Sequence, residues 1–293
     1  MIMSKQKPFY HAGTEKKLAA VESYLESFLS VMSNQRGIET VYIDAFAGTG
    51  TIPSGVDGGL LENLIDADEL AIGSALRALG LKRKFSRYIF IEKSSQKLEE
   101  LRSRVNQIEN APRCIEYIKG EASTELMKLC SMLGRSNVRS VVFLDPFGNQ
   151  VSWELLERLG KTKHVDLWYL FPAMLGVHRQ IGRNEAKMTP EQIASLDYLF
   201  GPHDWRDAFI SNEVQDDLFG PRERKVKIAD VDAITRYKIN CLEKVFEGCV
   251  LDEWLPLGRN GNHWYSLIFA MANPSSKAVK AGKAIARHIM RAS

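Results

Sequence analysis

Acidic residues directly follow several short apolar runs of this sequence and are the first candidates for chemistry. The run 41–43 reads as a buried strand and leads into Asp44, then Phe46, Gly48 and Gly50. Glycine lets a backbone approach a ligand closely because no Cβ intervenes. A phosphate requires bare N–H groups and positive potential, so a carboxylate here argues against a phosphate site. The ammonium and sulfonium groups of S-adenosylmethionine (SAM) suit Asp44 better, with a plain strand and turn as the alternative.

Two further carboxylates occupy equivalent places after apolar runs. Glu92 ends the predicted strand 86–92, where a carboxylate can accept hydrogen bonds from both ribose hydroxyls of a nucleoside. Glu121, followed by Ala122, comes after the predicted strand 115–118 and can accept the amino group of adenine. The competing interpretations are a surface Glu92 paired with a neighbouring lysine and a solvated Glu121 at a helix start. Both positions favour a ligand that contains a nucleoside.

The spacing between the glycines and Glu92 helps to distinguish a dinucleotide site from a SAM site. A dinucleotide fingerprint places its acid about 20 residues after the glycines, and Gly50 and Glu92 are much further apart. The interval holds a loop rich in Gly and Asp over 53–68 and a predicted short helix over 71–79. In a simple SAM site the helix follows the glycines directly. We therefore interpret the loop as a lid or a disordered segment, and NAD is disfavoured.

The catalytic candidate is the turn after the apolar run 141–144. This run breaks at Asp145, Pro146, Phe147 and Gly148. An amine nucleophile needs acceptors for its N–H groups, and the Asp145 carboxylate and the Pro146 carbonyl can supply two, since proline has no competing N–H. Phe147 can stack on a base. The alternative is a strand-ending turn, because Asp and Pro are both turn residues. We favour function, because ligands of open α/β sheets bind at the carboxyl ends of strands.

The composition is that of an ordinary globular protein. The 293 residues are 45% hydrophobic and 26% charged, with a net charge of +3 that is too small to indicate nucleic acid by itself. No apolar run approaches the length of a membrane span, and the first residues lack the apolar core of a signal peptide. The four cysteines show neither CxxC pairing nor zinc spacing. We expect a cytoplasmic protein with no metal site.

The order of elements predicts one Rossmann-like α/β domain over 1–293 with a mostly parallel seven-stranded sheet. A helix over 14–32 precedes strands that alternate with helices up to a fifth strand over 164–171. The segment 172–247 is polar and reads as a helical insertion or cap. Segments 249–257 and 263–272 then read as an antiparallel hairpin around Asn260-Gly261, before a basic helix over 277–290. This is the layout of the class I SAM-dependent methyltransferase fold.

Several motifs give the chain a resemblance to a known family. It resembles the three-Cys-motif partner proteins, which are bacterial methyltransferase-like proteins, over most of its length and least over 172–247. The resemblance implies a class I SAM-binding fold and a three-cysteine protein as genomic partner, without supplying a substrate. It is carried by the region of His11, Thr14 and Lys17 and by YLESFL, YIDAFAGTG, GSALRAL, FIEKS, FLDPFG and YSLIFAMANPSSKA.

The DPFG motif narrows the expected substrate. It is similar to the corresponding motif of tRNA guanine-N2 dimethyltransferases, whereas adenine amino-methyltransferases carry an aromatic residue in the place of Gly148. This departure favours another exocyclic amine of a nucleobase, such as that of guanine. Basic residues that can meet phosphates lie in three groups, although charge runs are usually solvated faces. These groups are Lys82, Arg83, Lys84 and Arg87; His178, Arg179 and Arg183; and Arg222, Arg224, Lys225, Lys227, Arg236 and Lys238.

Two functions follow from these observations. The first is a SAM-dependent methyltransferase that modifies an exocyclic amine of a nucleobase in nucleic acid, with RNA favoured. Its cofactor would contact Asp44, Phe46, Gly48, Gly50, Glu92, Glu121, Ala122 and Asp145, and Asp145, Pro146 and Phe147 would present the amine. The second is a non-catalytic or partner-dependent subunit that keeps the fold and acts with a three-Cys-motif protein.

Overall fold

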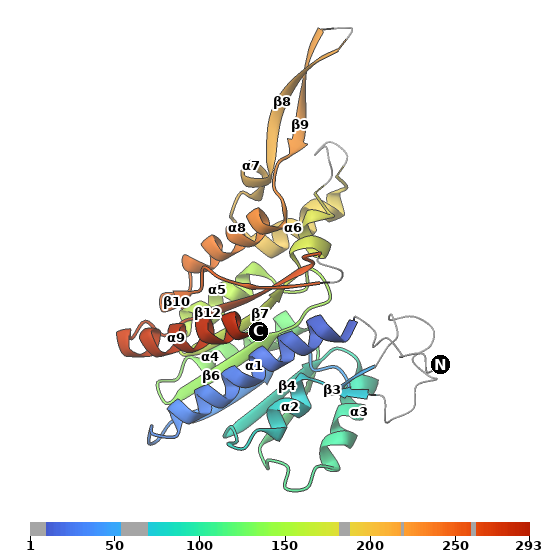
Figure 1. Ribbon diagram of the computed structural model, residues 1–293. Coiled ribbons are helices and arrows are strands. Elements are labelled where there is room, and N and C mark those ends of the chain that lie inside the picture. Colours follow the sequence, from blue (N-terminus) through green and yellow to red (C-terminus); the bar gives the residue numbers. More distant parts are fainter. Residues whose placement is uncertain (1–9, 54–69, 182–187, 218–219, 259–261) are drawn as a thin grey trace, which may run out of the picture.

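A mixed β-sheet with helices on both faces forms the centre of the protein (Figure 1). The structure, a computed structural model, describes residues 10–53, 70–181, 188–217, 220–258 and 262–293. Within these ranges the main sheet has eight strands, and two small two-stranded sheets accompany it. The main sheet contains β1 (Glu39–Asp44), β4 (Arg87–Glu92), β5 (Ile115–Lys119), β6 (Val138–Leu144), β7 (Val165–Phe171), β10 (Cys249–Val250), β11 (Leu255–Leu257) and β12 (Tyr265–Met271).

The helices divide between the two faces of the sheet. The core on one face includes residues of α1, α2, α3 and α9, and the core on the other includes residues of α4, α5, α6, α7 and α8. Their bounds are α1 (Tyr10–Met32), α2 (Ser74–Gly80), α3 (Ser95–Asn106), α4 (Ala122–Leu133), α5 (Trp153–Lys161), α6 (Pro190–Phe200), α7 (Trp205–Phe209), α8 (Val231–Glu243) and α9 (Ser276–Ala292), with a π-helix η3 (Ala173–His178).

The central strands are apolar because both of their faces are covered. Every residue of β7 is buried, and β1 is buried from its second residue onward. Along β1, Tyr42 enters the core on the α1 face, whereas Val41 and Ile43 enter the opposite core. This alternation of side chains requires helices on both sides of a parallel sheet.

The strand order confirms the predicted fold class. Across the sheet the strands follow one another as β5, β4, β1, β6, β7, β12 and finally β10 together with β11. The ladders from β5 to β7 are parallel, whereas β12 is antiparallel to β7, β10 and β11. Since β10 and β11 share the free edge of β12, the described sheet has seven strand positions. This is the layout of class I SAM-dependent methyltransferases.

Two local expectations need correction. The strand predicted over 249–257 is broken into β10 and β11, although both pair antiparallel with β12 as expected. The Asn260-Gly261 turn lies outside the described residues, as do 54–68 of the predicted loop. The helix predicted over 71–79 begins only at Ser74, because Leu70–Ile72 forms the strand β3 and pairs with β2 (Thr51–Pro53).

The segment 172–247 differs from the expected helical cap in two ways. It contains the antiparallel hairpin of β8 (Ile210–Asp217) and β9 (Gly220–Lys227), which extends away from the rest of the protein in Figure 1. Its last helix, α8, contributes Ile234 and Ile239 to the core on the sheet face that α4 and α5 also cover. The segment is therefore not uniformly helical, and α8 is one of the regular layer helices.

An unusual buried cation lies on α8. The Lys238 side chain is fully buried, and its Nζ donates a hydrogen bond of 2.7 Å to the Leu199 carbonyl oxygen. The Nζ also lies 5.0 Å from the ring centroid of Trp153 and 5.2 Å from that of Phe200. Burial lowers the pKa of Lys238 to about 7. The folded protein therefore holds this amine in a largely apolar, aromatic environment.

We expect Lys238→Met to flatten the dependence of stability on pH. Between about pH 7 and the ordinary lysine pKa, the unfolded chain binds one more proton at residue 238 than the folded chain. Stability of the wild type should therefore rise with pH in this window, by up to about 1.4 kcal/mol per pH unit from this group. The free energy of unfolding should be measured with urea at several pH values. The variant should exceed the wild type in this free energy by the largest amount near pH 6.

Lys280→Met, on the exposed side of α9, is the matched control and should leave the slope unchanged. If wild type and Lys238→Met had equal slopes, the aromatic rings would be keeping the amine charged throughout, and the depressed pKa would be wrong.

Candidate functional site

The sheet brings the predicted acidic residues to one edge. Asp44 and Glu92 end β1 and β4, while Glu121 and Asp145 lie just beyond β5 and β6. These four parallel strands are consecutive neighbours, in the order β5, β4, β1, β6. Their carboxyl ends therefore meet along one edge, where open α/β sheets bind their ligands.

Asp44 lies beneath the loop that follows β1 and is fully buried. Its carboxylate accepts hydrogen bonds of 2.5 Å from Ser74 Oγ and 3.1 Å from the Phe46 amide. Burial raises the pKa of Asp44 to about 6, the two hydrogen bonds oppose this rise, and the Asp145 carboxylate adds to it. The side chain therefore caps the start of the loop and directs negative potential at it.

Glycine occupies positions 48 and 50 of the loop for different structural reasons. Gly48 has a φ of +58° and Gly50 a φ of +80°, a region that side-chain-bearing residues rarely adopt. A Cβ on Gly48 would meet no atom within 4 Å, so space is open beside this backbone. A Cβ on Gly50 would lie 2.7 Å from Leu101 and 3.0 Å from Leu76. Gly48 thus leaves room for a ligand, whereas Gly50 is required by packing.

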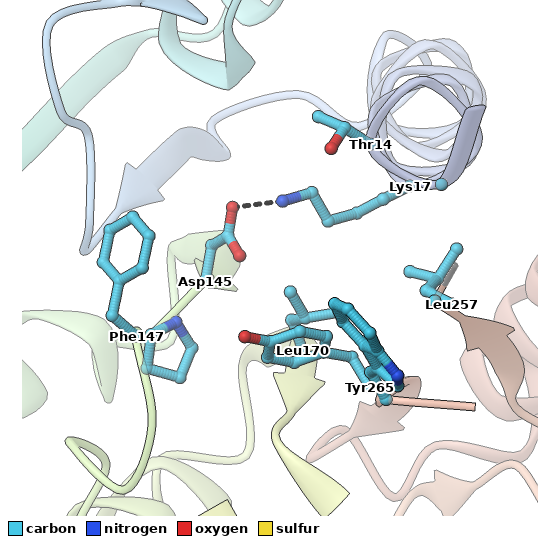
Figure 2. Close-up of a pocket in the computed structure, with 11 residues that line it drawn as sticks. Thr14, Lys17, Asp145, Phe147, Leu170, Leu257 and Tyr265 are labelled. Atoms are coloured by element: carbon cyan, nitrogen blue, oxygen red, sulfur yellow. Dashed lines mark hydrogen bonds and ion pairs between the residues drawn. The ribbon is translucent and has the colours of Figure 1, made fainter. Parts of the chain in front are cut away.

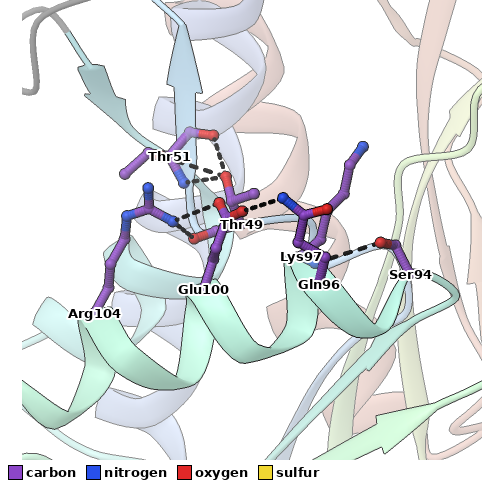
Figure 3. A network of polar contacts seen from close by, with 7 residues as sticks. All are labelled: Thr49, Thr51, Ser94, Gln96, Lys97, Glu100 and Arg104. Carbon is purple, nitrogen blue, oxygen red and sulfur yellow. Dashed lines mark hydrogen bonds and ion pairs between the residues drawn. The ribbon is translucent and has the colours of Figure 1, made fainter. Parts of the chain in front are cut away.

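Helix α3 fastens the loop from one side (Figure 3). Arg104 Nη1 donates a hydrogen bond of 2.9 Å to the Thr49 carbonyl oxygen and lies 3.5 Å from Glu100. The Thr49 hydroxyl in turn donates to the Thr51 carbonyl oxygen at 3.1 Å. These contacts fix the backbone on both sides of Gly50.

Glu92 binds the glycine loop directly. Its carboxylate accepts the Gly48 amide at 3.0 Å and the Ser94 amide at 2.9 Å. Lys93, one of the two lysines in the surface-pair interpretation of Glu92, forms an exposed ion pair of 2.5 Å with Glu121. The Glu92 carboxylate thus binds the two backbone amides, whereas Glu121 is an exposed residue at the start of α4. Ala122 is buried in the core at the first position of that helix.

The turn after β6 presents an aromatic ring to solvent. Pro146 is buried, whereas 81% of Phe147 is exposed. The Phe147 amide donates to Gln150 Oε1 at 3.0 Å, and Asn149 Nδ2 donates to the Gly176 carbonyl oxygen at 2.7 Å. An exposed phenylalanine on a turn held by such contacts is available for stacking on a planar ligand.

Lys17 was not among the predicted site residues, and the structure places it against Asp145. It lies on α1 and is 8% exposed, and its ammonium forms an ion pair with the Asp145 carboxylate. Two sequence signals concern Lys17. It lies in the region that carries the family resemblance, and it shares a helix face with Val21 and Leu25, where a buried side chain is expected. The partner, 128 residues away, has no local signal.

A pocket of about 200 Å³ lies around this ion pair (Figure 2). Figure 2 shows Thr14 and Lys17 reaching in from α1, with Asp145 and Phe147 across the pocket and Leu170, Leu257 and Tyr265 closing it. The walls are largely apolar or aromatic, which is typical of small-molecule sites. The lining residues are Gly13, Thr14, Lys17, Asp145, Pro146, Phe147, Leu170, Leu257, Gly258, Trp264 and Tyr265.

The basic residues expected to meet nucleic acid do not gather at this pocket. Arg222, Arg224 and Lys225 belong to β9 of the projecting hairpin, where Arg224 pairs in register with Glu213. Lys227 donates to the His178 carbonyl oxygen and has its pKa lowered to about 8 by burial. Lys238 lies in the core, and Arg236 donates a hydrogen bond of 3.0 Å to the Asp252 carbonyl oxygen. Arg183 lies outside the described residues. Lys82, Arg83 and Lys84 precede β4 and Arg87 is its first residue, so all four lie toward the opposite edge of the sheet.

In the part of the chain that the structure describes, no group of three or more His, Cys, Asp or Glu residues is arranged to hold a metal ion. Among the described helices, none is long and apolar enough to cross a bilayer.

Comparisons with known proteins give distant structural likenesses. No protein-family model matches the sequence, and the comparison with curated proteins gives no match either. A solved protein of Legionella pneumophila aligns at 12% identity and a TM-score of 0.42, over 80% of this chain and 94% of its own. The glycopeptide N-methyltransferase MtfA in complex with SAM aligns at 12% identity and a TM-score of 0.34, over 92% and 99%. These scores are low, so the fold assignment rests on the strand order and pairing.

We expect Gly50→Ala to destabilise the protein by about 1–3 kcal/mol, because a Cβ would press on Leu101 and Leu76 at a positive φ. Gly80→Ala, at the end of α2, is the matched control: its Cβ would meet nothing within 4 Å, and alanine favours a helix. Urea unfolding of both variants measures the difference. Equal stabilities would show that the loop rearranges freely around residue 50.

Proposed function

We propose that this protein is a SAM-dependent methyltransferase that acts on an exocyclic amine of a nucleobase, with RNA as the favoured substrate. The observation that carries the proposal is the position of Asp145, Pro146 and Phe147. They line a pocket just beyond the carboxyl end of β6, and the neighbouring strand β1 leads into the glycine loop. Open α/β sheets bind their ligands at such strand ends. The distant structural likenesses carry no part of this proposal.

The cofactor site of the proposal is the edge formed by β1, β4 and β5. The space beside Gly48 fits a ligand that approaches the backbone, and the negative potential of Asp44 fits an ammonium group. The Glu92 carboxylate stands at the strand end where a ribose would bind. Of the other residues of the proposed site, Phe46 and Gly50 shape the glycine loop. Glu121 and Ala122 would lie beside the adenine group of bound SAM. SAM supplies an activated methyl group.

The acceptor site of the proposal is the pocket around Asp145. A carboxylate oxygen and the Pro146 carbonyl would accept the two N–H groups of an amine, so that the nitrogen lone pair faces the methyl donor. The exposed Phe147 ring would stack on the base. Most of the rate enhancement would come from positioning, because the methyl group is already activated. A base in a duplex would first have to flip out, at a cost of a few kcal/mol.

A second candidate is a partner-dependent subunit of a three-Cys-motif protein, as the family resemblance suggests. The hairpin of β8 and β9 supports it, because this hairpin projects from the protein and leaves long strand edges accessible for pairing (Figure 1). Co-expression and co-purification with the three-cysteine protein test this candidate. Failure to form any complex would count against it.

Binding of S-adenosylhomocysteine (SAH) should weaken as the pH falls below about 6. Asp44 becomes protonated there, since burial raises its pKa to about 6, and the ammonium of the ligand then loses its counter-charge. We expect an affinity loss of about tenfold between pH 7.5 and pH 5 in calorimetric titrations. Asp44→Asn should bind weakly and without this pH dependence.

The matched control for Asp44 is Asp166→Asn. Asp166 is a second buried carboxyl whose pKa burial raises, to about 7, but it lies near the opposite edge of the sheet. This variant should keep the pH dependence of SAH binding. A wild-type affinity that did not change between pH 7.5 and pH 5 would remove Asp44 from the cofactor site.

Methyl transfer should depend on the Asp145 carboxylate. With SAM labelled in its methyl group, we expect label in total RNA, located on one nucleoside by digestion and mass spectrometry, and less or none in genomic DNA. Asp145→Asn should lower the rate by about 100-fold through the loss of a charge-assisted hydrogen bond, while SAH binding persists. Glu109→Gln, an exposed neutralisation elsewhere, should retain full activity. Full activity of Asp145→Asn would refute the role given to this residue.

A further inference from the structure

The ammonium of Lys17 is the feature of the pocket that the proposed chemistry does not use. Lys17 is nearly buried on α1, and its Nζ lies 5.9 Å from the centroid of the Phe143 ring. Burying a lysine costs desolvation and side-chain entropy, and the ion pair with Asp145 offsets part of this cost. The Asp145 side chain itself is 26% exposed. The ion pair therefore joins a lysine that is almost fully buried to an aspartate that is partly open to the pocket.

The ion pair uses one end of the carboxylate only. Lys17 Nζ binds Asp145 Oδ2. Figure 2 shows the other carboxylate oxygen turned toward the pocket that Leu170 and Tyr265 line. A bond from Lys17 to one oxygen holds the carboxylate in a single orientation, so the second oxygen has a fixed place. That oxygen can accept one N–H from a bound molecule without breaking the ion pair.

The charge of Lys17 also reaches beyond Asp145. The Asp145 carboxylate raises the pKa of Asp44, whereas the Lys17 ammonium lowers it. Two carboxylates and one ammonium thus share the region between the glycine loop and the pocket. Within the pocket, Lys17 and Asp145 are the two residues of charged type among those that line it, and their charges cancel. The remaining described walls are apolar, aromatic or uncharged.

We propose that Lys17 is a positioning and specificity-determining residue, which orients Asp145 and keeps the acceptor pocket neutral so that it takes an uncharged planar amine. This inference rests on the proposed function and deepens it. An alkylammonium, such as a lysine side chain or a protein N-terminus, would bring an uncompensated positive charge into an apolar pocket beside Lys17. An exocyclic amine of a nucleobase is uncharged and flat, so it can donate to Asp145 and lie against Phe147.

Two SAM analogues make this inference testable without the methyl acceptor. Sinefungin carries a protonated amine at the place of the transferable methyl group, whereas SAH has no charge there. In the wild type Lys17 balances the charge of Asp145, so sinefungin should bind with nearly the same affinity as SAH. In Lys17→Met the unpaired carboxylate should attract the sinefungin amine, so that the ratio of the two affinities shifts toward sinefungin by about tenfold or more.

The control variants separate this role from a merely structural one. Lys16→Met, an exposed neighbour on α1, should leave the ratio unchanged, and Lys17→Arg should restore most of the wild-type ratio because it keeps the charge. Lys17→Met combined with Asp145→Asn should abolish the shift in the affinity ratio, because residue 145 then has no carboxylate to attract the sinefungin amine. Thermal unfolding of each variant shows that it is folded.

The outcomes distinguish the inference from the proposed function. If both analogues bind but Lys17→Met keeps the wild-type ratio of affinities, the role of Lys17 is overturned and the cofactor site stands. If neither analogue binds to the wild type, the proposed function is overturned and the inference with it. A shift in Lys17→Met that persists in the double variant also overturns the inference, because it does not pass through Asp145.

Discussion

Burial of the central strands on both faces is the constraint on which the rest of this structure depends. Strands β1, β6 and β7 are almost wholly buried, so helices must cover both sides and side chains along the strands must be apolar. Polar chemistry is then confined to the places where strands end. Asp44 shows the limit of this rule, since its carboxylate is fully buried and is held by the Ser74 hydroxyl and the Phe46 amide. The candidate site is thus a consequence of the core rather than an addition to it.

Helix α1 is tied to the sheet at two distant points. Lys17 pairs with Asp145 beyond the carboxyl end of β6, and the Tyr24 hydroxyl donates a hydrogen bond of 2.7 Å to Asp166 near the amino end of β7. Because these strands are parallel neighbours, the two contacts lie toward opposite edges of the sheet. Burial raises the pKa of both Tyr24 and Asp166, and their hydrogen bond satisfies the two groups. The helix therefore has a fixed angle across the sheet, which gives Lys17 a defined place.

The sequence predicts those features that have a local signal. Largely apolar segments such as 141–144 and 164–171 predict the central strands, and the acids and glycines that follow strands predict which edge of the sheet carries the candidate site. The hairpin of β8 and β9 has no such signal, because charged and polar residues fill both of its strands and give no apolar alternation. The pairing of Lys17 with Asp145 joins residues 128 positions apart, and no local pattern reports it. Glu92 illustrates the same limit, since whether it binds a surface lysine or the Gly48 amide is decided by the sheet.

The composition of the pocket has a consequence for how the protein is made. Its walls come from residues 13–17 at one end of the chain and from residues 257–265 near the other, with Asp145 between them. During synthesis the first strands and α1 leave the ribosome long before β11 and β12 exist, and domains of this size fold as their parts become available. A nascent chain therefore lacks this pocket until residues 257–265 have left the ribosome, even where the glycine loop has already folded. The pocket thus forms later than the sheet edge beside it, because one of its walls comes from a segment made after the parallel strands.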